Sequence, residues 1–212
     1  VCGPCAGTIV ALVKPFIKAK IIFADHLNLR GSWDNKPICR MLYWNSKMSD
    51  YTVTLTKQNR NDYIRYFHIS PKKICYIYNW IDEQVFKTAQ TYQADSKKII
   101  TAGRLEYEKC YDRLIEIAKI VLPQHPDWEW HIYGGGELEK TIEHKIMDYG
   151  LEKQLILKGM SKKLLEEYHN YSIFALTSYI EGLPLVLLEA KVNHLPSVSF
   201  DILTGPSEII QN

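Results

Sequence analysis

Short apolar runs alternate with segments of helical periodicity along the whole chain of 212 residues. The runs that favour strands, because they are apolar or rich in β-branched residues, are 20–24, 50–56, 71–78, 98–102, 128–133, 154–159, 173–177 and 196–201. Strands that alternate with helices are joined by right-handed crossovers, which produce parallel sheets covered by helices on both faces. The sequence therefore predicts an α/β fold.

The segments between these runs have the apolar spacing of helices or the residues that begin one. The predicted helices are 8–18 with an interruption at Pro15, 37–49, 61–67 after Thr56, a helix ending at Leu122, 137–149, 162–170 with Ser161 as N-cap, and those beginning at Pro184 and within 205–210. Residues 83–97 show no clear period and are rich in Gln, Thr and Lys, which predicts a linker. The expected domains are therefore 1–82 and 98–212.

The stretch from Ile173 to Lys191 contains the most specific of these strand-to-helix connections. An apolar run ends at Thr177, Gly182 permits a tight turn, and Pro184 suits the first position of a helix, where an N–H would lack a partner. The first amides of a helix have no intrahelical acceptor, and the helix dipole favours negative charge beside them. The sequence therefore predicts an anion-binding turn here.

A second anion-binding loop is predicted after the strand at 98–102. Gly103 permits a tight turn, and Arg104 and Lys109 flank the loop that leads into the next helix. An Arg offers a fork of donors and a Lys a compact charge, so the two cations can converge on a diphosphate. Because open α/β sheets place ligands at the carboxyl ends of their strands, both loops are expected to serve one site.

Two carboxylates accompany the first of these loops. Glu181 lies on the turn, and Glu189 follows eight residues later, about two helical turns along. The pattern Glu181-x7-Glu189, with Gly182-Leu183-Pro184 between, resembles that of retaining glycosyltransferases of family 4. Gly103-Arg104-Leu105, followed by Lys109, also matches that family, which has the GT-B fold of two Rossmann-like domains facing a cleft.

The resemblance implies a role for each of the residues that match. Arg104 and Lys109 would steady the leaving diphosphate, Glu181 would lie against the donor sugar, and Glu189 would bind the ribose hydroxyls. His26, at the end of the strand at 20–24, would face the reaction centre from the first domain. The remaining donor-binding residues that the resemblance implies are Gly103, Gly136, Met160, Gly182, Leu183, Pro184 and Leu185. Gly136 and Met160 would lie near the nucleotide base.

The sequence departs from the family pattern at Cys110, where a glycine is usual, and this puts the detailed path of the loop in question. The resemblance covers the whole chain, but the chain covers only the middle of the family. It implies an internal fragment in which both domains are incomplete.

The implied activity is transfer of a sugar from a nucleoside diphosphate sugar to an acceptor hydroxyl with retained anomeric configuration. No Asp-x-Asp pair is placed to hold a metal, and two cations make one unnecessary, so no cofactor is expected. The resemblance implies a glycan or lipid-linked acceptor in the synthesis of a cell-surface polysaccharide such as lipopolysaccharide or capsule.

Composition limits the other partners. Lys and Arg total 26 against 24 Asp and Glu, a net charge of +2 that argues against nucleic acid as a partner. No apolar run approaches the roughly 18 residues of a membrane helix, and no signal peptide is visible. A soluble, cytoplasmic protein is expected, which the family resemblance would place peripherally at the inner membrane face. The sequence does not indicate an oligomeric state.

Four alternatives remain. Cys2-Gly3-Pro4-Cys5 has the sequence of a thioredoxin redox centre, but no strand precedes it, and a strand-end turn leading into a helix is the favoured interpretation. Gly134-Gly135-Gly136 suggests a dinucleotide site, but the G-x-G-x-x-G pattern is missing. The chain could also be a non-catalytic fragment that binds nucleotide sugars. A GT-B epimerase would need acid–base groups that this pattern does not supply.

Overall fold

The structure is a computed structural model that describes residues 1–88 and 92–210 of the chain. It divides into two compact units. Unit 1 consists of residues 1–80 with two returning segments, 180–183 and 202–210. Unit 2 consists of the described residues from 81 to 179 together with 184–201. Each unit is described by itself below.

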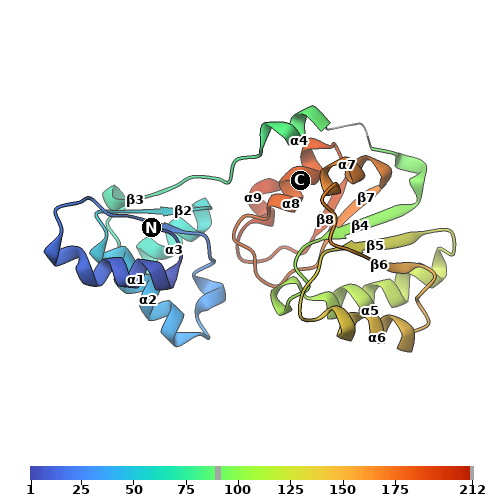
Figure 1. The fold of residues 1–212 in the computed structure, drawn as a ribbon, viewed down its shortest axis with the longest axis horizontal. Coiled ribbons are helices and arrows are strands. Elements are labelled where there is room, and N and C mark those ends of the chain that lie inside the picture. Colours follow the sequence, from blue (N-terminus) through green and yellow to red (C-terminus); the bar gives the residue numbers. More distant parts are fainter. Residues whose placement is uncertain (89–91, 211–212) are drawn as a thin grey trace. The chain divides into compact units, whose positions relative to one another are not determined.

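Unit 1 is a parallel sheet with helices packed against it (Figure 1). Its strands are β1 (Ile22–Asp25), β2 (Tyr51–Thr54) and β3 (Ile74–Tyr76), and its helices are α1 (Pro4–Val13), α2 (Lys36–Met48), α3 (Lys57–Phe67) and α9 (Pro206–Ile209). The strand order is β1-β2-β3, with Ile22 opposite Tyr51 and Thr52 opposite Ile74. Cys2 adds a single parallel bridge to Ala24 of β1.

The core of unit 1 lies between this sheet and its helices. Phe23 of β1, Leu42 of α2 and Tyr63 of α3 are almost fully buried together. Helix α3 begins where Thr56 accepts a hydrogen bond from the amide of Asn59, and it ends at His68 in the left-handed conformation with φ of 50°. These caps close both ends of the helix that carries the core residue Tyr63.

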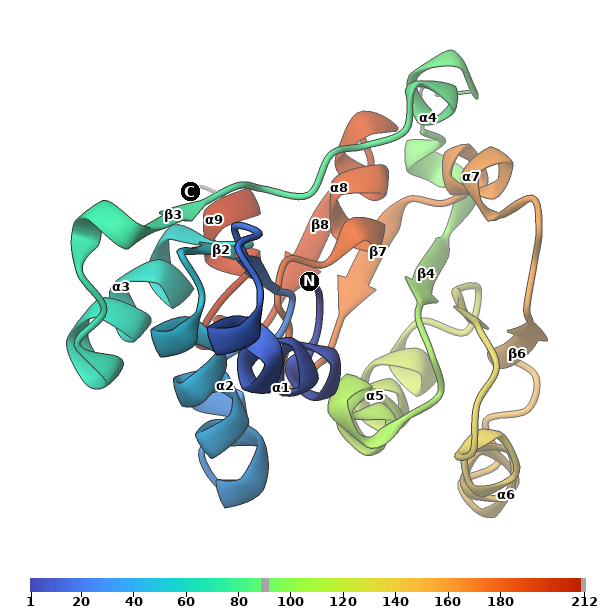
Figure 2. The same ribbon diagram turned by 60° about the vertical axis from the view of Figure 1, so that its left-hand side comes forward.

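Unit 2 holds the larger sheet. Its strands are β4 (Lys98–Ala102), β5 (Glu129–Tyr133), β6 (Leu155–Gly159), β7 (Ile173–Leu176) and β8 (Ser197–Ser199). Its helices are α4 (Glu83–Thr88), α5 (Tyr111–Val121), α6 (Glu139–Asp148), α7 (Leu164–Glu167) and α8 (Leu185–Val192). Helices α5 and α6 cover one face of the sheet, while α4, α7 and α8 lie on the other (Figures 1 and 2).

The strand order in unit 2 is β6-β5-β4-β7-β8, and every pairing is parallel. The chain runs outward from β4 through β5 to β6, then returns to the other side of β4 as β7. The side chains of Leu114 and Ile115 on α5 are buried against Trp130 and Ile132 of β5. Full burial of such a side chain contributes about 1.5–3 kcal/mol, so α5 anchors the loop that precedes it.

The α/β class and the parallel sheets predicted from the sequence are confirmed. Several boundaries differ. The first helix begins at Pro4 rather than residue 8, and the helix predicted at 162–170 shrinks to α7 followed by a 3-10 turn. Ser161 accepts a hydrogen bond from the amide of Lys163 in the turn before α7, and α7 itself has Lys163 as N-cap with no side-chain cap. Helix α4 occupies part of the predicted linker 83–97, of which residues 89–91 lie outside the described residues.

Candidate functional site

The carboxyl ends of β4 and β7 form the point in unit 2 where the strand order reverses. The two strands are neighbours, but β4 continues toward β5 and β7 continues toward β8 on the opposite side. Ligands of open α/β sheets bind in the crevice outside such a reversal. The residues that follow these two strands are therefore the first candidates for a ligand site.

The loop after β4 brings two of the predicted residues together. The side-chain stem of Lys109 lies over Gly103, whose Cα would carry a Cβ only 3.4 Å from Lys109 Cε. Tyr111 donates a hydrogen bond to the carbonyl of Gly103 at 3.1 Å. A Cβ at position 103 would be in ordinary van der Waals contact with the lysine, so the Lys109 stem packs directly beside the backbone of Gly103.

Arg104 points outward from the same loop. Its guanidinium is 2.8 Å from the carboxylate of Glu106, and its side chain is 73% exposed. An exposed ion pair of this kind contributes little to stability. The pair instead orients a cation whose remaining donors can meet a phosphate.

Cys110 adopts the left-handed conformation, with φ of 51° and ψ of 54°. This conformation favours glycine, because a Cβ there crowds the following carbonyl. The loop therefore follows the path expected of a glycine, even though the residue is a cysteine.

The glycine-rich loop after β5 packs directly on the loop after β4. A Cβ on Gly134 would lie 1.9 Å from the carbonyl oxygen of Gly103, and one on Gly136 would lie 2.6 Å from that of Leu105. A Cβ on Gly135 would lie 3.1 Å from Met160, whose side chain is 85% exposed. Unit 2 thus places Gly136 against the loop that begins at Gly103, and Met160 beside the neighbouring Gly135.

Helix α8 holds the remaining predicted residues of unit 2. Pro184 is the N-cap of α8, with φ of −70° and ψ of 112°, so the expectation that it occupies the first helical position is wrong. Its extended ψ keeps it outside the helix, while its carbonyl accepts the first hydrogen bonds, from Leu187 and Leu188. The amides of Leu185 and Val186 precede those bonds, and the Leu185 side chain is 45% exposed.

Glu189 lies in α8 and is half-buried. The hydroxyl of the fully buried Tyr168 donates a hydrogen bond to its carboxylate at 3.0 Å. Burial raises the pKa of Glu189 above its ordinary value, although the hydrogen bond from Tyr168 opposes this. Tyr168 is a partner that could not be predicted from the sequence, because nothing in the local pattern of residues 162–170 points to a contact with α8.

In unit 1, His26 lies beside the turn that carries Glu181 and Gly182. A Cβ on Gly182 would lie 2.7 Å from the carbonyl oxygen of His26. Thr204 donates a hydrogen bond to the carbonyl of Glu181 at 2.6 Å, and Asn28 donates one to the Thr204 hydroxyl at 2.7 Å. Glu181 is 8% exposed, whereas His26 is exposed.

Leu183 ends this turn and is buried. Its carbonyl accepts a hydrogen bond from the side-chain amide of Asn79 at 2.9 Å. The predicted residues therefore form two groups. One contains His26, Glu181, Gly182 and Leu183 in unit 1, and the other contains the residues of unit 2.

A buried carboxylate, Asp25, directly precedes His26 at the end of β1. Asp25 is fully buried and accepts hydrogen bonds from the amide of Leu27, the side chain of Asn59 and the hydroxyl of Tyr63. Burial raises its pKa, and these three donors and the charge of His26 oppose the rise. From the sequence, Asp25 is recognisable only as a polar residue at a strand end, because its burial depends on the helices packed over it.

The structure also bears on the alternative sites. Cys2 and Cys5 are exposed free thiols at the start of α1. Within residues 1–88 and 92–210, no group of three or more His, Cys, Asp or Glu side chains is placed to hold a metal ion. No helix in these same ranges is long and apolar enough to cross a membrane.

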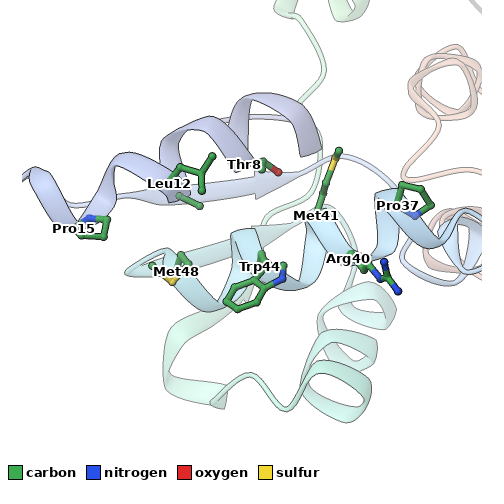
Figure 3. A pocket seen from close by; sticks show the side chains of 9 residues that line it. Thr8, Leu12, Pro15, Pro37, Arg40, Met41, Trp44 and Met48 are labelled. Atoms are coloured by element: carbon green, nitrogen blue, oxygen red, sulfur yellow. The ribbon is translucent and has the colours of Figure 1, made fainter.

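An apolar groove in unit 1 contains none of the predicted site residues. It has a volume of about 610 Å³ and lies between α1 and α2, as Figure 3 shows. Its lining residues are Thr8, Ala11, Leu12, Pro15, Pro37, Arg40, Met41, Trp44 and Met48.

Comparisons with known proteins show the family to which the chain is similar. Residues 82–212 match the family described as "Glycosyl transferases group 1". The "Amylovoran biosynthesis glycosyltransferase AmsD" of Erwinia amylovora is 30% identical over 92% of this chain and 55% of its own length. The "Poly(ribitol-phosphate) alpha-N-acetylglucosaminyltransferase" of Staphylococcus aureus is 27% identical over 88% of this chain and 38% of its own. The chain thus spans about half or less of these relatives.

Solved structures are similar as well. A mutant of S. aureus TarM, in complex with Fondaparinux, alpha-GlcNAc-glycerol and UDP, matches 92% of this chain and 39% of its own. Its TM-score is 0.82, with 26% sequence identity. The similar solved structures are GT-B glycosyltransferases, and the fold class expected from the sequence is therefore confirmed as GT-B-like.

Proposed function

The chain belongs to the glycosyl transferases group 1 family, and we propose that it serves the transfer of a sugar from a nucleoside diphosphate sugar to an acceptor hydroxyl. We propose further that the anomeric configuration is retained, as the resemblance to family 4 implies. One observation supports this most strongly. Lys109 lies over Gly103 at the carboxyl end of β4, beside β7, where a sheet of this topology binds its ligand.

Departure of the diphosphate is the step that needs most help, since negative charge grows on the leaving group. In the proposed mechanism Arg104 and Lys109 bind the two phosphates, and the first amides of α8 supply further donors. Donors held in place before the reaction stabilise such charge at little cost in reorganisation. Because these residues can balance the charge of a diphosphate, the proposal requires no metal.

Two carboxylates, Glu189 and Glu181, bind the ribose and the sugar of the nucleoside diphosphate sugar. Glu189 accepts hydrogen bonds from the ribose hydroxyls, a task for its ionised form, and Tyr168 fixes its orientation. Glu181 orients the sugar, and His26 contacts the sugar or the acceptor. Gly136 and Met160 lie near the base. A glycan or a lipid-linked glycan is the proposed acceptor, since relatives of this chain act in glycan synthesis.

Titration calorimetry with UDP, GDP, ADP and NADH tests the donor class. UDP comes first, because the similar TarM structure contains it. We expect one nucleoside diphosphate to bind and Lys109→Ala to weaken it by about 2 kcal/mol, the loss of a charge-assisted hydrogen bond. Lys153→Ala, at an exposed lysine of unit 2, is the matched control and should bind as the wild type does. Binding of NADH alone would contradict the proposal.

The stereochemical course is measured separately. The coupling constant of the anomeric proton in the product, measured by nuclear magnetic resonance, distinguishes retention from inversion. An inverted product would refute the proposed retention. Nucleotide binding without any transfer, even in a chain of full family length, would instead support the non-catalytic alternative. Alkylation of Cys2 and Cys5 at ordinary thiol rates would remove the redox alternative.

We also propose peripheral association with an anionic membrane through α1 and α2. The exposed apolar side chains of this region include Ile9 (65%), Leu12 (71%), Phe16 (86%) and Trp44 (58%). Exposed cations lie in the same region, among them Lys18, Lys20 and Arg40. Apolar side chains flanked by cations are typical of helices that bind at a lipid interface.

Co-sedimentation with vesicles tests this association. Vesicles containing phosphatidylglycerol should bind the protein, and Phe16→Ser should reduce that binding. Trp80→Ser, at a tryptophan that is 77% exposed, is the matched control and should leave binding unchanged. Equal binding to vesicles of phosphatidylcholine alone would argue against an electrostatic contribution.

A further inference from the structure

Arg113 of α5 holds its guanidinium between two aromatic rings of unit 2. The guanidinium carbon is 4.3 Å from the ring centroid of Tyr179 and 4.2 Å from that of Phe200. Its Nη1 donates a hydrogen bond to the carbonyl of Thr177 at 3.3 Å. One cation thus contacts the turn after β7, the segment after β8 and, through its own helix, the loop after β4.

The turn after β7 is bonded directly to the loop that carries Lys109. The Thr177 hydroxyl donates to the carbonyl of Lys109 at 3.2 Å, and the amide of Tyr179 donates to the carbonyl of Glu108 at 2.9 Å. The ring of Tyr179 also lies 6.0 Å from that of Tyr107. These contacts set the spacing between the two loops.

We infer that Arg113 is a positioning residue that holds the loop of Lys109 and the turn after β7 at the separation needed to bind a diphosphate. The inference rests on the proposed function, and it assigns to Arg113 no contact with the nucleoside diphosphate sugar. Its planar guanidinium can stack on both rings at once while donating to Thr177. A lysine could not do all three.

To separate a positioning role of Arg113 from a purely structural one, the experiment needs a control cation that makes a similar contact elsewhere. Helix α5 supplies one in Lys119, whose ammonium nitrogen lies 4.1 Å from the ring centroid of Tyr149. Both cation–π pairs start from the same helix, but Tyr149 lies at the C-terminal end of α6, and its hydroxyl donates to Glu116 of α5. Loss of either pair should cost similar stability, and only loss of the Arg113 pair should affect nucleotide binding.

The experiment measures the dissociation constant of UDP, GDP and ADP by calorimetry and the free energy of unfolding by urea for each variant. We expect Arg113→Leu to weaken binding of the preferred nucleotide about tenfold, which is about 1.4 kcal/mol. Arg113→Lys should fall between it and the wild type. Lys119→Leu should bind as the wild type does while losing stability comparable to Arg113→Leu.

Tyr179→Leu changes a side chain that is 44% exposed, so it tests the contact between Arg113 and Tyr179 with little risk to folding. It should weaken binding as Arg113→Leu does, and the double variant should lose less than the sum. Tyr179→Phe keeps the ring and should restore binding.

Two results would overturn the inference while leaving the proposed function intact: wild-type affinity in Arg113→Leu, or an equal loss of affinity in Lys119→Leu. If the wild-type protein binds none of the three nucleotides, the proposed function fails and the inference fails with it. The wild-type titration therefore decides between the two failures.

Discussion

Two carboxylates, one in each unit, are both raised in pKa by burial but are satisfied in different ways. Asp25 at the end of β1 is fully buried and accepts hydrogen bonds from three donors of the protein. Glu189 in α8 is half-buried, and among the described residues it accepts one side-chain hydrogen bond, from Tyr168. In both cases one donor is a fully buried tyrosine, Tyr63 for Asp25 and Tyr168 for Glu189.

The difference indicates different roles. The donors around Asp25 use most of its acceptor capacity, so it holds the backbone at Leu27 and, through it, the position of His26. Glu189 has one donor and partial exposure, so it retains capacity to accept hydrogen bonds from a ligand. A raised pKa alone would not separate the two, because structural networks also perturb pKa values.

The largest expected effect is on stability at Asp25. Asp25→Ala should lower the free energy of unfolding by about 3 kcal/mol, because buried donors left without an acceptor each cost about 1–3 kcal/mol. Urea denaturation measures this. Asp34→Ala, at an exposed aspartate of unit 1, is the control and should change stability little. If Asp25→Ala lowered the free energy of unfolding by no more than Asp34→Ala does, the hydrogen bonds around Asp25 would not stabilise the fold.

The next effect concerns ligand affinity at Glu189. Glu189→Gln should weaken binding of the preferred nucleoside diphosphate about tenfold, or about 1.4 kcal/mol. The reason is that a neutral amide accepts hydrogen bonds from the ribose hydroxyls less strongly than a carboxylate does. Its stability should change by less than that of Asp25→Ala. Calorimetry measures the affinity, and Glu143→Gln on α6 is the exposed control. Unchanged affinity would contradict a ribose-binding role.

The two tyrosines give a matched pair of smaller changes. Tyr63→Phe and Tyr168→Phe each remove one hydroxyl that donates to a carboxylate. Each should lower stability by about 1 kcal/mol, the usual net value of one hydrogen bond. Only Tyr168→Phe should also reduce nucleotide affinity, since it releases the orientation of Glu189. An equal loss of affinity in both variants would remove the distinction between the two carboxylates.

The smallest expected effect is in the pH dependence of stability. The ordinary pKa values are 3.8 for Asp25 and 4.5 for Glu189, and the folded state raises both. The folded state therefore holds these protons more strongly, so the free energy of unfolding should fall as the pH rises from the ordinary value through the raised one. Asp25→Asn and Glu189→Gln should each remove their part of this slope. Urea denaturation at a series of pH values measures it, and an unchanged slope in both variants would contradict the raised pKa values.

Much of the framework could be predicted from residue patterns. The strand predicted at 98–102 is β4 with the same bounds, because four consecutive buried positions leave a clear apolar run. The loop from Gly103 to Lys109 was also recognisable, because its glycine and both cations lie within one short stretch of sequence. Boundaries near Pro184 and Ser161 were less predictable, because capping depends on backbone angles that several residue types adopt.

The sequence by itself determined the order of strands and helices, the α/β class and the identity of the residues near each strand end. Only the tertiary structure decided which of these residues meet. The contacts of Gly136 with Leu105, of Tyr168 with Glu189 and of Arg113 with Phe200 join segments that are far apart in the chain. Periodicity reports which face of an element is buried, but not which neighbour buries it. That choice depends on the packing of the sheet and its helices, and so do the donors that distinguish Asp25 from Glu189.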